Sequence, residues 1–212
     1  MSALTTESIP YVPDRVMGMI TGVLLAAGNS RRFGSNKLLT EVDKQSLIMY
    51  AAQSLSPCDR IIAVVRGSDH ELQKLLHENG IEPVINEHAD DGIGTSIACG
   101  VKASDSSDGW LFLPADMPFI KKSTTLEIVE ALNAGNDIVS PHYKNKRGHP
   151  VGFSSRFRDK LMALDEDIGA RDIITGNQDK LLLVDVYDEG ITIDIDTPEE
   201  LQLLVMQGSR IS

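Results

Sequence analysis

The stretch Gly22-Val23-Leu24-Leu25-Ala26-Ala27-Gly28-Asn29-Ser30-Arg31-Arg32-Phe33-Gly34-Ser35-Asn36-Lys37 decides the fold. An apolar, strand-like run ends at a turn of small residues, and basic residues follow it closely. Small side chains let a ligand approach the backbone, and glycine permits a turn that directs several N–H groups at one point. With the charges of Arg32 and Lys37, this pattern predicts a cradle for a polyphosphate.

Two well-known phosphate-binding loops do not fit this stretch. The dinucleotide fingerprint G-x-G-x-x-G needs closely spaced glycines, but none lies between Gly28 and Gly34. A P-loop needs Gly-Lys-Ser/Thr, whereas Ser35 follows Gly34. The missing fingerprint disfavours a nicotinamide-dependent oxidoreductase. An ordinary strand-to-helix turn with solvated basic residues is the alternative interpretation of the loop.

Composition indicates one globular domain. The 212 residues are 42% hydrophobic and 24% charged, which suffices for a full core. We expect residues 1–18 to form a flexible lead-in and residues 19–212 to form a single domain. The formal charge of −11 argues against binding to nucleic acid or to an anionic membrane. An anionic substrate must therefore be captured by a local basic site, such as the opening loop.

Cysteine content and hydropathy favour a cytoplasmic protein. Cys58 and Cys99 are too few for a disulfide framework, and no Cys/His cluster suggests zinc. The apolar run from Val16 to Ala27 is shorter than the roughly 18–20 residues that a membrane span needs. No basic region or cleavage site marks it as a signal peptide.

Strand-like and helix-like patterns alternate along the chain. Apolar runs predict strands at Val23–Ala26, Ile61–Val65, Pro83–Ile85, Trp110–Leu113, Asp137–Ser140 and Leu181–Val186. Three- and four-residue spacings predict helices at Leu47–Leu55, His70–Glu78, Thr95–Lys102, Ser123–Ala134, Arg156–Leu164 and Ala170–Thr175. Pro150–Phe153 indicates a short antiparallel excursion. The predicted fold is Rossmann-like α/β, with a mostly parallel twisted sheet and helices on both faces.

Sequence signals also mark the ends of several helices. Gly80 and Gly135 stand where helix C-caps are expected. A last helix is predicted to start at Pro198, with Thr197 as its N-cap and Glu199 and Glu200 in its first turn.

Carboxylates follow two of the predicted strands. Asp116 lies just beyond Trp110–Leu113 and is flanked by prolines, while Asp194 and Asp196 share a face of an extended segment. Ligands of such sheets bind beyond the carboxyl ends of the strands. Mg²⁺ typically takes one or two protein carboxylates and completes its shell with water and phosphates. We therefore predict a Mg²⁺ site at Asp116 and Asp196, with Asp194 either supporting it or serving only as a turn residue. A lone Asp116 that caps a turn is the alternative.

Six motifs, in order from residue 22 to residue 200, resemble those of the molybdenum cofactor cytidylyltransferases. They are Leu-Ala-Ala-Gly-x-Ser-x-Arg-Phe-Gly-x-x-Lys, the segment Asn86–Ser96, Leu-Pro-Ala-Asp-Met-Pro at 113–118, Arg-Gly-His-Pro at 147–150, Gly-Ala-Arg at 169–171, and Asp-Ile-Asp-Thr-Pro-Glu at 194–199. The resemblance implies catalytic roles for Arg32, Lys37 and Asp116, and a nucleotide site formed by Leu25, Ala26, Ala27, Gly28, Arg32, Lys37, Gly94, Thr95 and Asp116. It also implies acceptor binding by Arg147, His149 and Arg171, and metal binding by Asp116 and Asp196.

Some of these assignments have plainer alternatives. His149 in a polar loop is equally typical of an ordinary surface histidine, and Arg171 could simply pair with Asp172 or Asp167. Phe33 replaces a commoner methionine, and residues 40–44 replace a turn that usually contains proline and glycine. Ala27 favours the cytidylyl branch, because guanylyl relatives usually carry a second glycine there.

The resemblance implies transfer of CMP from CTP to molybdopterin-bound molybdenum cofactor, with release of pyrophosphate and with Mg²⁺ as cofactor. A molybdoenzyme or its maturation chaperone is the implied protein partner. One alternative keeps the chemistry but uses GTP, or a sugar phosphate as acceptor. Another is a carrier that binds the cofactor and hands it to a molybdoenzyme.

Overall fold

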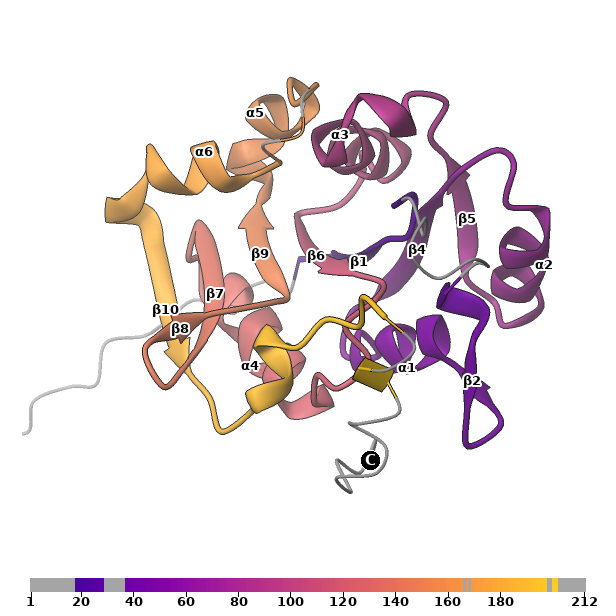
Figure 1. Ribbon diagram of the computed structural model, residues 1–212. Helices are drawn as coiled ribbons and strands as arrows, with labels where there is room; N and C mark the ends of the chain where they lie inside the picture. The colour runs from indigo at the N-terminus through magenta and orange to yellow at the C-terminus, as the bar shows by residue number, and fades with distance from the viewer. Residues whose placement is uncertain (1–17, 29–36, 166, 168, 198–199, 202–212) are drawn as a thin grey trace, which may run out of the picture.

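A central mixed sheet organises the molecule (Figure 1). The computed structural model describes residues 18–28, 37–165, 167, 169–197 and 200–201. The main sheet has the order β10-β7-β9-β6-β1-β4-β5, with β8 paired to β7. Its strands are β1 (Ile20–Leu25), β4 (Arg60–Val65), β5 (Glu82–Ile85), β6 (Gly109–Pro114), β7 (Ile138–Tyr143), β8 (Lys146–Arg147), β9 (Val151–Ser154) and β10 (Leu181–Asp185).

Most neighbouring strands of this sheet run parallel. β1 pairs in parallel with both β4 and β6, β4 with β5, and β7 with β10. β9 is antiparallel to both of its neighbours, β6 and β7. The predicted fold class and the antiparallel excursion at Pro150–Phe153 are thus confirmed.

Helices cover both faces of the sheet (Figure 1). One core cluster unites strand residues such as Leu24 and Leu111 with helices α1 (Leu47–Ser54), α2 (His70–Glu78) and α4 (Lys122–Asn133). The other unites Val23 and Trp110 with α3 (Ile93–Ala103), α5 (Arg158–Met162) and α6 (Arg171–Thr175). Successive residues of one strand therefore enter opposite cores, which explains why these strands are apolar without interruption.

The order of the strands defines where a ligand can enter. The chain passes from β1 to β4 and β5 on one side, then returns so that β6 lies on the other side of β1. The connections leave β1 and β6 in opposite directions, which opens a crevice at their carboxyl ends. The segments Leu25–Gly28 and Pro114–Asp116 meet at this switch point, where Ala115 N–H donates to the Leu25 carbonyl at 3.1 Å.

Local sequence signals explain several chain reversals. Gly80 and Gly135 have φ of 73° and 91°, and each comes one residue after the C-cap of its helix, Asn79 after α2 and Ala134 after α4. The glycines thus end these helices in the left-handed conformation that their sequence positions indicate. Strands β2 (Glu41–Val42) and β3 (Gln45–Ser46) form a hairpin whose turn residues, Asp43 and Lys44, also have positive φ. This turn replaces the glycine-containing turn usual in the resembling family.

The C-terminal half departs slightly from the predicted element bounds. The helix expected at Arg156–Leu164 is split into a 3₁₀ turn, η3 (Ser155–Phe157), and α5, while α6 begins one residue after the predicted Ala170. Residues 198–199 lie outside the described residues, as does the predicted lead-in apart from Gly18. Within the described part, no helix is long and apolar enough to cross a membrane.

Candidate active site

A cleft opens at the switch point between β1 and β6. Its volume is about 520 Å³, within the range of small-molecule sites. The loop after β1, the end of β6 and the approach to α3 form its walls. The residues that line it are Leu25, Ala27, Gly28, Arg66, Ala89, Asp90, Asp91, Gly92, Ile93, Ser96, Pro114, Asp116 and Asp167.

Lys37 joins two carboxylates at the edge of this cleft. Its Nζ donates to Asp116 Oδ2 at 2.8 Å, to the Ile195 carbonyl at 2.8 Å and to Asp196 Oδ1 at 3.2 Å. Three segments far apart in sequence therefore converge on one ammonium group. The structure brings Lys37 together with Asp116 and Asp196, the two carboxylates that the sequence predicts as a metal-binding pair.

Short, well-anchored elements hold these three side chains. Lys37 begins a 3₁₀ turn, η1 (Lys37–Leu39), whose middle residue Leu38 is buried in the core. Asp116 follows β6, and its carbonyl accepts the Ile195 N–H at 3.0 Å, which fixes the segment that carries Asp196. The end of β6 thus fixes the backbone at Asp116, and the hydrogen bond between Ile195 and Asp116 fixes the backbone next to Asp196.

A capping box completes the support of Asp196. Glu200 N–H donates to Thr197 Oγ1 at 3.2 Å, and Glu200 Oε2 accepts the N–H groups of Thr197 at 3.0 Å and Asp196 at 2.7 Å. The predicted N-cap role of Thr197 is confirmed. The cap also fixes the backbone of Asp196.

The negative charges of Asp116 and Asp196 stabilise the ammonium group of Lys37, and they would also attract a metal cation. Burial opposes the charge on Lys37, but its hydrogen bonds to Asp116 and Asp196 prevail and raise its pKa. Two carboxylates that reach the same cation suit Mg²⁺, which needs few protein ligands when phosphates supply the rest. Among the described residues there is no cluster of three or more His, Cys, Asp or Glu side chains that could hold a metal.

The predicted nucleotide-binding residues differ in their positions. Leu25, Ala27 and Gly28 line the cleft, whereas Ala26 is 2% exposed and packs in the core. Gly94 and Thr95 lie in the first turn of α3, next to the lining residues Gly92, Ile93 and Ser96 rather than among them. Arg32 lies outside the described residues.

Asn86 explains the spacing of the motif that contains Thr95. The Asn86 side chain is buried and donates to Thr95 Oγ1 at 2.9 Å and to Ser96 Oγ at 3.0 Å. Its Oδ1 accepts the His88 N–H at 2.9 Å. This side chain therefore fastens the segment before α3 to the first turn of that helix, and it shapes the wall of the cleft.

The predicted acceptor-binding residues occupy three separate elements. Arg147 is exposed on β8, His149 is partly buried after it, and Arg171 is exposed at the start of α6. Arg171 forms no ion pair with Asp172 or Asp167, all three of which are described. No hydrogen bond joins the three predicted acceptor residues within the described part of the chain.

The surroundings of His149 disfavour its charged form. Burial lowers its pKa, against smaller opposing effects of a hydrogen bond to the Phe112 backbone and of the charges of Asp116 and Asp194. Its Nδ1 is buried and has no hydrogen-bond partner. The charge of Asp116 therefore acts on His149, although burial outweighs it and lowers the pKa of the imidazole.

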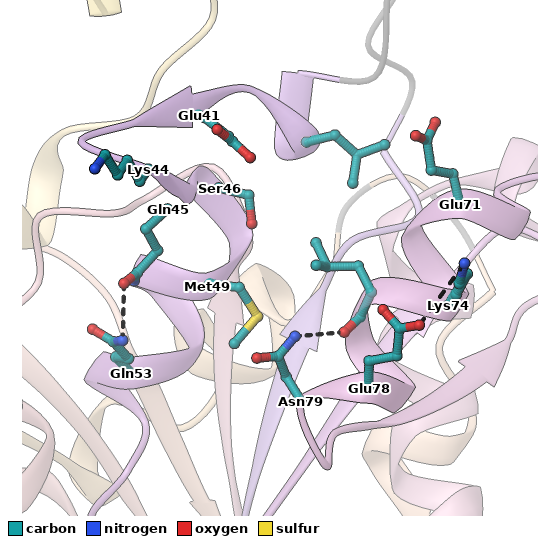
Figure 2. A pocket seen from close by; sticks show the side chains of 12 residues that line it. Glu41, Lys44, Gln45, Ser46, Met49, Gln53, Glu71, Lys74, Glu78 and Asn79 are labelled. Carbon is teal, nitrogen blue, oxygen red and sulfur yellow. Dashed lines mark hydrogen bonds and ion pairs between the residues drawn. The ribbon is translucent and has the colours of Figure 1, made fainter.

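A second cavity, of about 530 Å³, lies between α1, α2 and the β2–β3 hairpin (Figure 2). We call it the α1–α2 cavity. Leu39, Glu41, Lys44, Gln45, Ser46, Met49, Gln53, Glu71, Lys74, Leu75, Glu78 and Asn79 line it. The polar pairs drawn in Figure 2, such as Gln45–Gln53 and Lys74–Glu78, join residues that are close in sequence. None of the predicted site residues that the structure describes lines it.

Comparison with known proteins identifies relatives over most of the chain. The family model described as the MobA-like NTP transferase domain matches residues 22–181. Purine catabolism protein PucB of Bacillus subtilis is 30% identical over 198 residues, which cover 87% of this chain and 95% of that protein. Nicotine blue oxidoreductase of Paenarthrobacter nicotinovorans is 26% identical over 206 residues, covering 91% and 99%. A probable molybdenum cofactor guanylyltransferase of Pyrococcus horikoshii is 28% identical over 145 residues, covering 67% and 73%.

Solved structures share the fold. Rv0371c of Mycobacterium tuberculosis superposes with a TM-score of 0.76 at 23% identity, covering 89% of this chain and 98% of that one. A second structure of that protein, in complex with manganese, gives a TM-score of 0.70 at 21% identity, with the same coverage.

Proposed function

The chain belongs to the MobA-like NTP transferase domain family, and we propose that it transfers CMP from CTP to molybdopterin-bound molybdenum cofactor. One observation supports this above all: Lys37, Asp116 and Asp196 converge beside a cleft at the carboxyl ends of β1 and β6. That arrangement suits a nucleoside triphosphate together with a divalent cation. The relatives named molybdenum cofactor guanylyltransferases support the acceptor class.

The proposed transfer does not need a strong general base. A phosphate monoester on the acceptor is already ionised near neutral pH, so it can attack the α-phosphorus without giving up a proton. What remains is alignment and the neutralisation of charge on the departing pyrophosphate. Lys37 and Arg32 would supply that charge, and a preorganised donor of this kind contributes roughly 3–4 kcal/mol.

Asp116 and Asp196 would hold Mg²⁺, which supplies charge compensation at the phosphates when bound. The manganese complex of a structural neighbour supports the use of a divalent metal. Lys37 must then exchange its carboxylate partners for phosphate oxygens, because the same two carboxylates serve the metal.

Base choice rests on Ala27. Ala27 lines the cleft although it is 4% exposed and also packs in the second core cluster. We infer that its Cβ makes the base site narrower than a glycine would. A narrower site favours cytosine, the smaller ring. GTP is the alternative donor, and the names of several relatives favour it.

The test offers radiolabelled CTP and GTP in equal amounts, with Mg²⁺ and molybdopterin cofactor, and measures pyrophosphate and dinucleotide products. We expect the cytosine dinucleotide to dominate. A guanine product would overturn base choice but not transfer. Saturable binding without pyrophosphate release would indicate a carrier instead.

A second candidate function follows from the near full-length relative named nicotine blue oxidoreductase. If the protein is a nucleotidyltransferase, CTP with Mg²⁺ should raise its melting temperature, whereas NADH or NADPH should not change it. Stabilisation by a nicotinamide cofactor alone would favour the oxidoreductase.

A further inference from the structure

Arg66 stands out among the residues that line the cleft, because sequence patterns gave it no role. It directly follows β4, and its own backbone is braced from α2. Its carbonyl accepts from Gln73 Nε2 at 2.9 Å and from the Asp69 N–H at 3.2 Å. These two hydrogen bonds fix the backbone of Arg66, independently of the contacts that its guanidinium makes.

The guanidinium joins opposite walls of the cleft. Its Nε donates to the Ala27 carbonyl at 2.8 Å, on the loop that follows β1. Its Nη1 pairs with Asp90 Oδ1 at 2.8 Å, and its Nη2 reaches the Ala89 carbonyl at 3.4 Å, both on the 3₁₀ turn η2 (Ala89–Asp91). A planar fork with several fixed donors can span this gap, whereas the single ammonium group of a lysine cannot.

The contact with Ala27 also orients the next backbone donor. In a trans peptide the carbonyl and the following N–H point in opposite directions. Arg66 holds the Ala27 carbonyl toward itself, so the Gly28 N–H must point away from it. Among the described residues, none lies within 4 Å of a Cβ built on Gly28, so their packing around that carbon does not fix this peptide.

Arg66 also differs from the other lining residues in its charge. Four of the lining residues are aspartates, namely Asp90, Asp91, Asp116 and Asp167, and Arg66 is the only cation among the described residues that line the cleft. A triphosphate entering such a cleft meets strong repulsion unless cations offset it. The side chain of Arg66 is 20% exposed, so a ligand can reach it.

We propose that Arg66 is a positioning residue of the donor-nucleotide site. It sets the direction of the Gly28 N–H and the spacing between the loop after β1 and η2, and so preorganises the cleft for a nucleoside triphosphate. This rests on the proposed nucleotidyl transfer. Preorganisation of a bound substrate acts on ground state and transition state alike, so it appears in KM rather than in kcat.

The matched control, Arg60, lies at the other end of the strand that Arg66 follows. Arg60 begins β4 at the opposite edge of the sheet and pairs with Glu82, so it copies the residue type and the ion pair without reaching the cleft. The set of variants is Arg66→Ala, Arg66→Lys, Asp90→Asn and Arg60→Ala. Each is measured for melting temperature, for kcat and KM with CTP, and by calorimetry with a nonhydrolysable CTP analogue and Mg²⁺.

We expect Arg66→Ala to raise KM about tenfold or more, by the loss of several charge-assisted hydrogen bonds, with kcat within threefold of the parent. Arg66→Lys should recover less than half of the lost affinity on a logarithmic scale, because it restores charge but not the fork. Asp90→Asn keeps the Ala27 contact and should raise KM about threefold. Arg60→Ala should stay within twofold of the parent.

Three results would overturn the proposal. The first is that Arg66→Ala has the same KM as Arg60→Ala. The second is that Arg66→Lys restores full affinity, so that only the charge of Arg66 matters. The third is that Arg66→Ala lowers kcat while KM stays constant. If Arg66→Ala does not fold, Asp90→Asn decides, and an unchanged KM there counts against the proposal. Failure of the parent to bind or turn over any nucleoside triphosphate would instead refute the proposed function, and with it this inference.

Discussion

The cleft and the α1–α2 cavity have almost the same volume, about 520 and 530 Å³, but they differ in how their polar groups are held. In the α1–α2 cavity, partners are close in sequence, as in the i,i+4 pair of Lys74 and Glu78. At the cleft, Lys37 meets carboxylates that lie 79 and 159 residues away. Local pairs form on almost any helix surface, whereas half-buried charges drawn from distant segments require the whole fold to place them. Convergence of this kind, and not volume, marks the candidate active site.

The largest effect should come from Asp116→Asn. The amide keeps the shape of the side chain but removes a charge, so it weakens a divalent metal without opening a cavity. We expect turnover to fall about 10³-fold at saturating Mg²⁺, with the melting temperature nearly unchanged. Steady-state pyrophosphate release measures it.

Glu71→Gln is the matched change in the α1–α2 cavity, where it also converts a lining carboxylate to an amide. Its turnover should stay within twofold of the parent. If instead Glu71→Gln abolished turnover and Asp116→Asn remained within threefold, the two cavities would exchange roles.

Lys37→Ala should have the next largest effect. Its removal takes away the ammonium group that pairs with both Asp116 and Asp196, and it withdraws a charge from the leaving pyrophosphate. We expect transfer to slow about 100-fold while KM for the acceptor changes little. Single-turnover rates with CTP measure the first quantity and acceptor titrations the second. A raised acceptor KM with unchanged turnover would place Lys37 at the other substrate.

Sequence sufficed for the parts of the site that lie at strand ends. An apolar run followed by a carboxylate places Asp116 at the carboxyl edge of a parallel sheet, whatever the details of packing. The capping box of Thr197 and Glu200 is a local pattern as well, and it fixes Asp196 nearby. Such elements depend on neighbours within a few residues, which a sequence shows directly.

Sequence did not suffice where long-range contacts decide a role. The sequence places Arg66 at the ligand-side end of a strand, but it gives no sign that this side chain spans a cleft, so the role of Arg66 emerged only with the fold. Thr95 matched a motif, yet its hydroxyl is engaged by Asn86 and by the carbonyls of His88 and Gly92. The segment predicted as one helix at Arg156–Leu164 is a 3₁₀ turn followed by a short α-helix. The prediction missed this change because hydrophobic periodicity does not distinguish a 3₁₀ turn from an α turn.

A third, smaller effect concerns the dependence of stability on pH. Burial lowers the pKa of His149 in the folded protein, so the unfolded chain binds a proton more readily. Stability is therefore lost as the pH falls below the ordinary histidine value of 6.5, toward the lower folded value. His149→Gln should flatten this decline between pH 7.5 and 5.5 in urea titrations. The exposed His77, changed to Gln, should leave this decline intact, and equal slopes in both variants would contradict a lowered pKa of His149.

The smallest effect, and the finest test of the comparison, is Ser46→Ala in the α1–α2 cavity. Ser46 is the N-cap of α1 and 8% exposed, but its hydroxyl neither caps the helix nor meets any partner. An N-cap usually contributes about 1 kcal/mol, whereas an unpaired buried hydroxyl costs roughly 1–3 kcal/mol. We therefore expect Ser46→Ala to leave the free energy of unfolding unchanged or to increase it slightly. Thr197→Ala removes a hydroxyl that does accept the Glu200 N–H, so it should lower that energy by about 1 kcal/mol. Equal losses in the two variants, measured by urea denaturation, would show that Ser46 caps α1 after all, and that the polar groups of the α1–α2 cavity are as fully used as those beside the cleft.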